Sequence, residues 1–182
     1  MQLTRTQWLE QGLITLSDKG PQHIKIDVLC QALGVTKGSF YHHFKHHAEY
    51  VSALLEHWEA THTRQLIDDV ADIEDVRKRS ERLSELVYSK DMRPEVAMRA
   101  WGKSHPEVAA RVQAVDAQRL VYLTHLAVQL GATAAQAKLL AQMGYAQLVG
   151  IQHLQQHISP KEAAGMDQAL HAMVYSQLDK AP

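Results

Sequence analysis

Apolar residues recur at spacings of three and four along almost the whole chain, which is the spacing of one face of an α-helix. Isoleucine and valine follow this spacing too and do not alternate with polar residues, so no strand pair is predicted. The pattern predicts an all-α fold with about nine helices. Their expected ranges are 3–17, 26–33, 36–44, 46–70, 75–89, 94–102, 106–130, 134–157 and 160–178.

Residues at the ends of these segments support the same boundaries. Gly34 follows the second segment, where a residue that tolerates positive φ ends a helix well. Thr36 and Thr133 stand where side-chain caps are expected. The segments Ser104–Glu107 and Ser159–Glu162 each combine serine, proline and glutamate in the order of a capping box with proline in the first turn. We therefore expect helices to begin at both.

The second and third segments match a helix-turn-helix. Gly34 supplies the turn residue that such a motif needs, and Val35 is an apolar residue that can seal the two helices together. Cys30 and Ala32 are small enough to lie where the helices cross. Such a motif presents the N-terminal residues of its second helix to base edges in the major groove of DNA.

The residues at that position are Thr36, Lys37, Gly38 and Ser39. Lysine can donate to guanine or phosphate, and serine and threonine hydroxyls can contact either. Gly38 costs about 1 kcal/mol of helix stability relative to alanine. It would be tolerated if a side chain blocked close approach to DNA or to the neighbouring helix. The buried side of the same helix is expected to carry Phe40 and Phe44, four residues apart.

The segment Gly34–Phe44, GVTKGSFYHHF, resembles the signature of the tetracycline-repressor (TetR) family of bacterial regulators, which commonly reads GVSKGTLYHYF. The resemblance is dense over about the first fifty residues and looser beyond them. It implies a DNA-binding domain at 1–47, a ligand-binding and dimerisation domain at 48–182, and a homodimer on a palindromic operator. It also implies a repressor in which a small-molecule ligand shifts helix 46–70 and lowers operator affinity.

Carried over residue by residue, the resemblance places Thr36, Lys37, Gly38 and Ser39 near bases, and Tyr41 and His42 near phosphates. Two positions depart from the family pattern. Lys25 stands where a capping threonine is common; lysine cannot cap in that way but can meet phosphate. His47 stands where the family commonly has a phosphate-binding lysine, and Lys45 is another source of that charge.

Four histidines crowd the end of this stretch. His42 and His46 are four residues apart, as are His43 and His47, and such pairs on one helix can bind a metal ion. A helix break between them spoils that spacing, and structural zinc sites use four ligands. Catalysis is disfavoured because no third group orients a histidine toward Ser39. We therefore expect no enzyme, metal or cofactor. We favour phosphate contact for His42 and His47, and for His43 and His46 a solvated helix edge is an equal alternative.

The larger, C-terminal part of the chain carries aromatic, methionine and histidine residues of the kind that line small-molecule cavities. Ordinary core packing is the alternative for each. The candidate ligand-binding residues are Trp58, Met98, Trp101, His105, Tyr122 and His125.

The last two helices are expected to pair with those of a second copy in a four-helix interface, because small residues there would allow close packing. The candidate interface residues are Ala137, Leu140, Ala141, Gly144, Leu148 and Ile151.

Composition narrows the choice of function. Hydrophobic residues make up 46% of the 182 residues, enough for a core, and the net charge is −1. Residues 1–47 carry five Lys or Arg against three Asp or Glu, a mild hint of a polyanion partner. With Cys30 as the single cysteine, no apolar run long enough for a bilayer and no signal-peptide core, we expect a cytoplasmic protein. A DNA-bound adaptor whose body binds a protein, and a histidine-based metalloprotein, are the alternatives.

Overall fold

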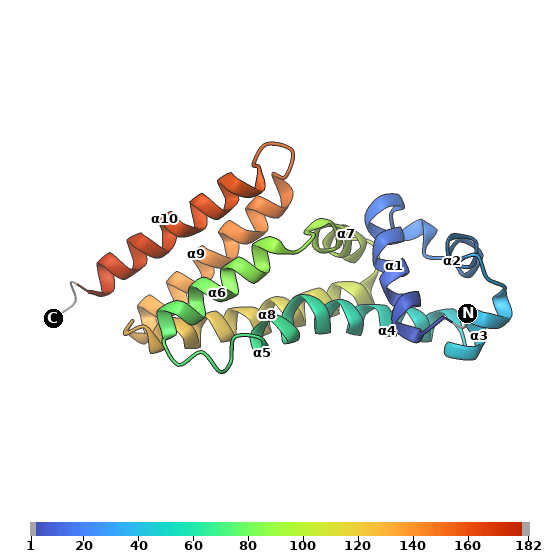
Figure 1. Ribbon diagram of the computed structural model, residues 1–182, viewed down its shortest axis with the longest axis horizontal. Helices are drawn as coiled ribbons and strands as arrows, with labels where there is room; N and C mark the ends of the chain where they lie inside the picture. The colour runs from blue at the N-terminus through green and yellow to red at the C-terminus, as the bar shows by residue number, and fades with distance from the viewer. Residues whose placement is uncertain (1–2, 180–182) are drawn as a thin grey trace. The chain divides into compact units, whose positions relative to one another are not determined.

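The computed structural model describes residues 3–179, and every regular element within them is helical (Figure 1). The segments α4, η2 and α5 follow one another without interruption; taken as one, they give nine helices in the described residues, so the predicted all-α fold is confirmed. The α-helices are α1 (Arg5–Lys19), α2 (Ile26–Leu33), α3 (Lys37–His43), α4 (His47–Glu59), α5 (Gln65–Asp68), α6 (Val76–Ser89), α7 (Arg93–Gly102), α8 (Pro106–Gln129), α9 (Ala134–His153) and α10 (Pro160–Leu178), with a 3-10 turn η1 (Pro21–His23) and a π-helical turn η2 (Ala60–Arg64).

Two of the predicted helix caps form and two do not. Thr133 and Ser159 each make a full capping box with the residue three positions later. Thr36 occupies the N-cap position of α3, but its side chain makes no capping hydrogen bond, so that prediction was wrong. The box expected at Ser104 is also wrong: α8 begins at Pro106, and the Ser104 hydroxyl donates instead to the carbonyl of Trp101 at 3.3 Å.

Helix α9 ends at His153, four residues before the predicted end at 157. The amides of His157 and Ile158 both donate to the carbonyl of Leu154, and these bonds close a turn in place of a further helical turn.

The chain divides into two compact units. Unit 1 comprises Met1–Thr61 and Arg93–Val112, and unit 2 comprises His62–Met92 and Gln113–Pro182. Chain contacts therefore group α7 with α1–α4. The predicted division at 47/48 concerns binding functions and stays a prediction.

An aromatic cluster holds α1, α3 and α4 together in unit 1. Trp8, Phe40, Phe44 and Tyr50 are all buried, and the rings of Trp8 and Phe40 meet edge to face at 5.5 Å. The Tyr50 hydroxyl donates to the carbonyl of Trp8 at 2.9 Å. This packing requires glycine at position 12, because a Cβ there would lie 2.1 Å from the Tyr50 oxygen. Phe40 and Phe44 thus lie in the core, as predicted.

In unit 2, α10 packs against α6 and α9 (Figure 1).

Side-chain hydrogen bonds hold the π-helical turn η2. The Arg119 guanidinium of α8 donates to the Thr63 hydroxyl at 2.8 Å and to the His62 carbonyl at 3.1 Å. Arg119 also donates to the hydroxyl of Tyr145, which in turn donates to Asp116 at 2.6 Å. Arg119 of α8 therefore satisfies polar groups of η2, and Tyr145 of α9 contacts Arg119 in turn.

Candidate nucleic-acid interface and ligand cavity

The turn between α2 and α3 has the geometry that the sequence predicted. Gly34 lies in the left-handed region at φ 66°, ψ 33°, a conformation that glycine adopts without steric cost. The Val35 amide donates to the Cys30 carbonyl at 3.0 Å and so closes the end of α2. Cys30 is buried where Ala32 is exposed, so Cys30 is the small residue on the packed side of the helix.

The first turn of α3 faces outward. Thr36, Lys37 and Gly38 are exposed, and Ser39 is half-buried. A Cβ built on Gly38 would meet nothing closer than the Thr36 hydroxyl at 3.6 Å, an ordinary van der Waals distance. Packing within the chain therefore gives no reason for glycine at position 38.

Lys37 is partnered by a carboxylate in this structure. Its Nζ lies 2.6 Å from Asp27 Oδ1, across the turn on α2. The hydrogen bond that Lys37 donates to Asp27 raises the pKa of the Lys37 ammonium, so the side chain stays charged. Both side chains are largely exposed, 62% for Lys37 and 71% for Asp27, so a phosphate or base edge can compete for the lysine.

The other predicted phosphate contacts occupy the surface of unit 1. Lys25 stands at the N-cap position of α2 without a side-chain capping bond, as expected for lysine. Tyr41, His42 and Lys45 are exposed, and the Tyr41 ring lies edge to face against Phe40 at 5.5 Å. Their role as phosphate contacts stays a prediction.

Three of the four clustered histidines contact the chain's own backbone. His43 Nε2 lies 2.8 Å from the Leu3 carbonyl, and His47 Nε2 lies 2.6 Å from the Ile24 carbonyl. The Glu49 amide donates to His46 Nδ1 at 3.1 Å, which makes His46 the cap of α4. For His43 and His46 the structure thus gives roles that the sequence did not predict. In residues 3–179, no three His, Cys, Asp or Glu side chains form a group that could hold a metal ion.

Four of the six candidate ligand residues lie in unit 1. Trp58 and Met98 are fully buried, and the Trp58 indole donates to the buried carboxylate of Glu95 at 2.9 Å. Trp101 meets His105 at 5.5 Å, and His105 Nδ1 is buried without a hydrogen-bond partner among the described residues.

The other two candidates lie in unit 2. Tyr122 packs beside the buried cluster of Leu66, Val70 and Leu83, and His125 is exposed. None of the six lines the cavities described next, and their ligand-binding role stays a prediction.

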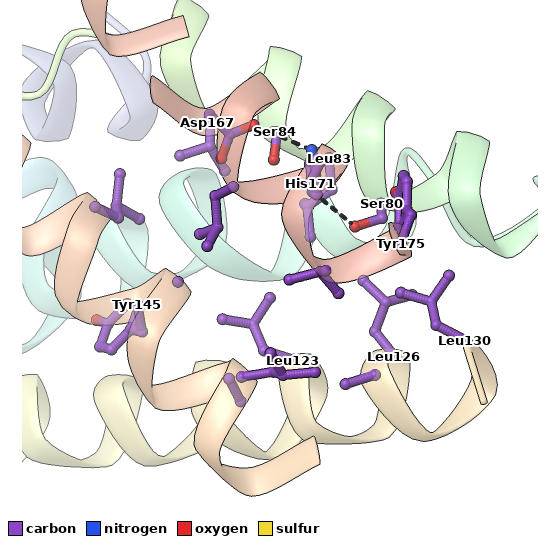
Figure 2. A pocket seen from close by; sticks show the side chains of 18 of the residues that line it. Ser80, Leu83, Ser84, Leu123, Leu126, Leu130, Tyr145, Asp167, His171 and Tyr175 are labelled. Atoms are coloured by element: carbon purple, nitrogen blue, oxygen red, sulfur yellow. Dashed lines mark hydrogen bonds and ion pairs between the residues drawn. The ribbon is translucent and has the colours of Figure 1, made fainter. Parts of the chain in front are cut away.

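Unit 2 contains a cavity of about 140 Å³ between α6, α8, α9 and α10 (Figure 2). On its polar edge His171 Nε2 lies 3.1 Å from the Ser80 hydroxyl, and His171 Nδ1 lies 3.4 Å from Asp167. The Tyr175 ring stacks on His171 at 5.6 Å. The sequence did not predict a role for these residues. Asp167 and His171 are four apart and so share a helix face, but nothing in the sequence connects that face to Ser80.

The six candidate interface residues point into the chain. Ala137, Ala141 and Ile151 are buried by the chain itself. Leu140, Ala141, Gly144 and Leu148 line the cavity. Large apolar residues are instead exposed on other faces of the same two helices: Leu139, Met143, Met166 and Met173.

None of the described helices carries an apolar stretch long enough to span a bilayer.

Comparison with known proteins finds a partial sequence match to one curated protein and a shared fold with several solved structures. No protein-family model matches the chain. The transcriptional regulator AcuR of Cereibacter sphaeroides is 35% identical over 66 residues, a match that covers 36% of this chain and only 30% of that protein.

Solved structures match over nearly the whole chain. A transcriptional regulator from Rhodococcus sp. Rha1 has a TM-score of 0.77 at 14% identity and covers 99% of this chain and 100% of its own. A putative TetR-family regulator from Rhodococcus sp. also has a TM-score of 0.77, at 18% identity over 94% and 98% of the two chains. A putative regulator from Saccharomonospora viridis in complex with choline has a TM-score of 0.73, at 15% identity over 93% and 94%. The chain therefore has the fold of TetR-family transcriptional regulators.

Proposed function

We propose that the protein is a dimeric, sequence-specific DNA-binding regulator of the TetR family, a repressor that leaves its operator when a small molecule binds. The observation that carries the proposal is the outward-facing first turn of α3. Lys37 and Gly38 are exposed there behind a left-handed glycine turn, and Gly38 has no packing reason within the chain. A helix-turn-helix presents these positions to base edges.

In the proposed complex, Thr36, Lys37, Gly38 and Ser39 approach bases, while Lys25, Tyr41, His42 and Lys45 approach phosphates around them. His47 can donate to a phosphate in only one protonation state. Its Nε2–H is used on the Ile24 carbonyl, so it can donate to phosphate only through Nδ1–H, in the imidazolium form.

The dimer is proposed to form through the exposed apolar residues of α9 and α10, and not through the residues that line the cavity. Leu139 is 57% exposed, Met143 50% and Met173 60%, and Leu139 and Met143 share one face of α9 because they are four residues apart. A twofold dimer has a functional reason, since its two recognition helices must reach major grooves about 34–36 Å apart.

The release step is proposed to begin in unit 2, where the cavity lies. One regulator of the same fold was crystallised with choline, so this fold accommodates a small organic molecule. A ligand that binds one conformation better than another shifts the population toward it. The 14–18% identity of these neighbours carries no ligand identity to this chain.

The test is selection of bound sequences from random double-stranded DNA, followed by fluorescence anisotropy on the enriched site. We expect a palindromic site, binding that weakens as salt rises, and one dimer on each site. Enrichment of no sequence would contradict the proposal. The adaptor alternative uses the same head, and the exposed apolar residues of α9 and α10 would then bind a different protein; a monomeric mass for the purified chain would favour it.

A further inference from the structure

We propose that unit 2 binds a small organic cation with a short apolar tail, an amine or a quaternary ammonium ion. This inference rests on the proposed function for its regulatory meaning, but the binding itself does not. The site consists of two adjoining spaces. The inner chamber is the cavity of about 140 Å³ described above, and the outer chamber is a larger space of about 540 Å³.

The inner chamber suits an apolar group of limited size. Its wall is mostly aliphatic and includes Leu83, Leu123, Leu126, Leu140, Leu148 and Leu170. A dry cavity of about 150 Å³ lined in this way holds a molecule as large as benzene. A tail of about six carbon atoms is therefore the size that this chamber accepts.

The two chambers adjoin along one polar wall. Ser84, Tyr88, Asp167, His171 and Tyr175 line both of them. A single ligand can therefore place its tail in the inner chamber and its head in the outer one. Figure 2 shows Asp167 and His171 on α10 at the edge of the leucine-lined space.

The charge of the outer chamber selects the sign of the head. Glu81, Glu85 and Asp167 line it, and among residues 3–179 no lysine or arginine lines either chamber. Glu85 is paired with Arg82 at 2.8 Å, so Glu81 and Asp167 provide most of the negative potential. Arg77 packs over the Tyr175 ring at 4.8 Å and is itself paired with Asp179. An anionic head would face carboxylates, which costs free energy in a partly desolvated site.

Asp167 is positioned for a ligand. Its side chain is only 16% exposed, and His171 contacts one of its oxygens, Oδ2. Ser80 holds the far side of the His171 ring, so the carboxylate sits in a fixed place. A carboxylate has about four lone-pair sites, and an amine head can donate N–H bonds to those that His171 does not use. A quaternary ammonium head has no N–H and is attracted by the negative charge alone. Burial raises the pKa of the Tyr88 hydroxyl to about 12, so this tyrosine adds no negative charge of its own.

Ser80, His171 and Asp167 are also the residue types of a hydrolytic triad, but the site lacks the accompanying oxyanion donors. Ser80 lies inside α6, where backbone amides are already used by the helix. The arrangement therefore positions a carboxylate and does not activate a nucleophile.

The test is calorimetry with four probes that share a hexyl tail or an ammonium head: hexyltrimethylammonium, hexan-1-ol, hexanoate and tetramethylammonium. We expect the hexyl cation to bind at least about tenfold more tightly than the alcohol, and hexanoate to bind most weakly. Asp167→Asn should lower the affinity for the hexyl cation to that for hexan-1-ol, and it should leave the affinity for hexan-1-ol unchanged. Asp72→Asn, an exposed carboxylate of unit 2 that lines neither chamber, is the control.

A second variant tests the tail without altering a charge. A Cβ on Gly144 meets only Leu170, at 3.8 Å, so Gly144→Leu can be accommodated in α9 while its outer atoms fill the inner chamber. This variant should weaken the binding of hexyltrimethylammonium and leave the binding of tetramethylammonium unchanged. Equal affinity for cation and alcohol, or an unaltered profile in Asp167→Asn, overturns the proposed ligand class. Binding of the cation with no change in operator affinity supports the site and overturns the proposed release mechanism instead.

Discussion

Lys37 Nζ lies 2.6 Å from Asp27 Oδ1, so the central cation of the proposed recognition helix is already held by a carboxylate of the preceding helix. DNA must displace Asp27 to use this lysine. We expect Asp27→Asn to raise affinity for unrelated DNA more than for the operator, because the neutral amide no longer competes with phosphate for Lys37. Anisotropy on both DNAs measures the two affinities and their ratio, and unchanged affinity for both DNAs would show that Asp27 does not compete.

Replacing Lys37 with alanine should lower operator affinity by about tenfold. If the lysine meets phosphate, the slope of log affinity against log salt should also shrink by about one. Lys19→Ala, an exposed lysine at the end of α1, is the matched control and should leave both quantities unchanged. Equal affinities for Lys37→Ala and the parent protein would remove Lys37 from the interface.

Gly38→Ala separates stability from binding. The Cβ fits, since nothing in the chain lies closer than 3.6 Å, and alanine favours helix over glycine by up to about 1 kcal/mol. We expect a higher free energy of unfolding together with at least about tenfold weaker operator binding. Gly165→Ala is the control, because a Cβ there meets nothing within 4 Å. It should raise the free energy of unfolding and leave operator binding unchanged. If Gly38→Ala is more stable and still binds the operator with full affinity, Gly38 does not provide clearance for DNA.

The approach of α1 to α4 depends on two residues together. Gly12→Ala would place Cβ 2.1 Å from the Tyr50 oxygen, so it should destabilise the fold strongly. Tyr50→Phe should cost about 1 kcal/mol through the lost bond to Trp8. The double variant should be more stable than Gly12→Ala alone, because the clashing oxygen is gone. Urea denaturation of all four proteins measures the coupling, and additive losses would contradict the clash.

Charges on the exposed apolar face should dissociate the proposed dimer. Leu139→Glu and Met143→Glu add carboxylates to α9, where two copies would bring them together. We expect a monomer by light scattering and much weaker operator binding. Val121→Glu, on α8 at a side chain 71% exposed, is the matched change and should leave the mass unaltered. If the Leu139 and Met143 variants keep the mass of the parent, the dimer uses another surface.

Stability should fall as pH drops below 6.5. Burial lowers the pKa of His57 below its usual 6.5, with partial opposition from Glu10. The unfolded chain then binds a proton more readily than the folded one, so the free energy of unfolding decreases as pH falls through this range. His57→Gln should flatten that slope between about pH 7 and 5. If the free energy of unfolding of His57→Gln changes with pH as steeply as that of the parent protein, other groups cause the pH dependence.

Local signals in the sequence predicted several helix ends and core positions correctly. Gly34 ends α2 in the left-handed conformation, Phe40 and Phe44 lie in the core, and Ser159 caps α10 as expected. Each of these rests on residues within a few positions of one another, where chain geometry leaves little choice.

The cavity could not be found in this way. Ser80 and His171 meet across 91 positions, and that contact depends on how α6 and α10 pack. Likewise, small residues at helical spacing look the same whether they pack inside one chain or between two. Ala137 and Ala141 proved to be covered by their own chain. The same kind of evidence predicts Trp58 as a ligand residue, and in the structure its indole donates to Glu95.

The hydrogen bonds of the clustered histidines define where their protons lie. His43 and His47 donate through Nε2–H to carbonyl oxygens, a bond that the imidazolium form keeps. His46 accepts at Nδ1 from the Glu49 amide, which requires that nitrogen to be bare. His46 therefore caps α4 only with its proton on Nε2, and such a cap is worth about 1 kcal/mol. All three rings thus carry Nε2–H, but His43 and His47 use theirs on the chain's own carbonyl oxygens, so the histidine that the helix needs as a cap is also the one whose Nε2–H is not used on those two carbonyls.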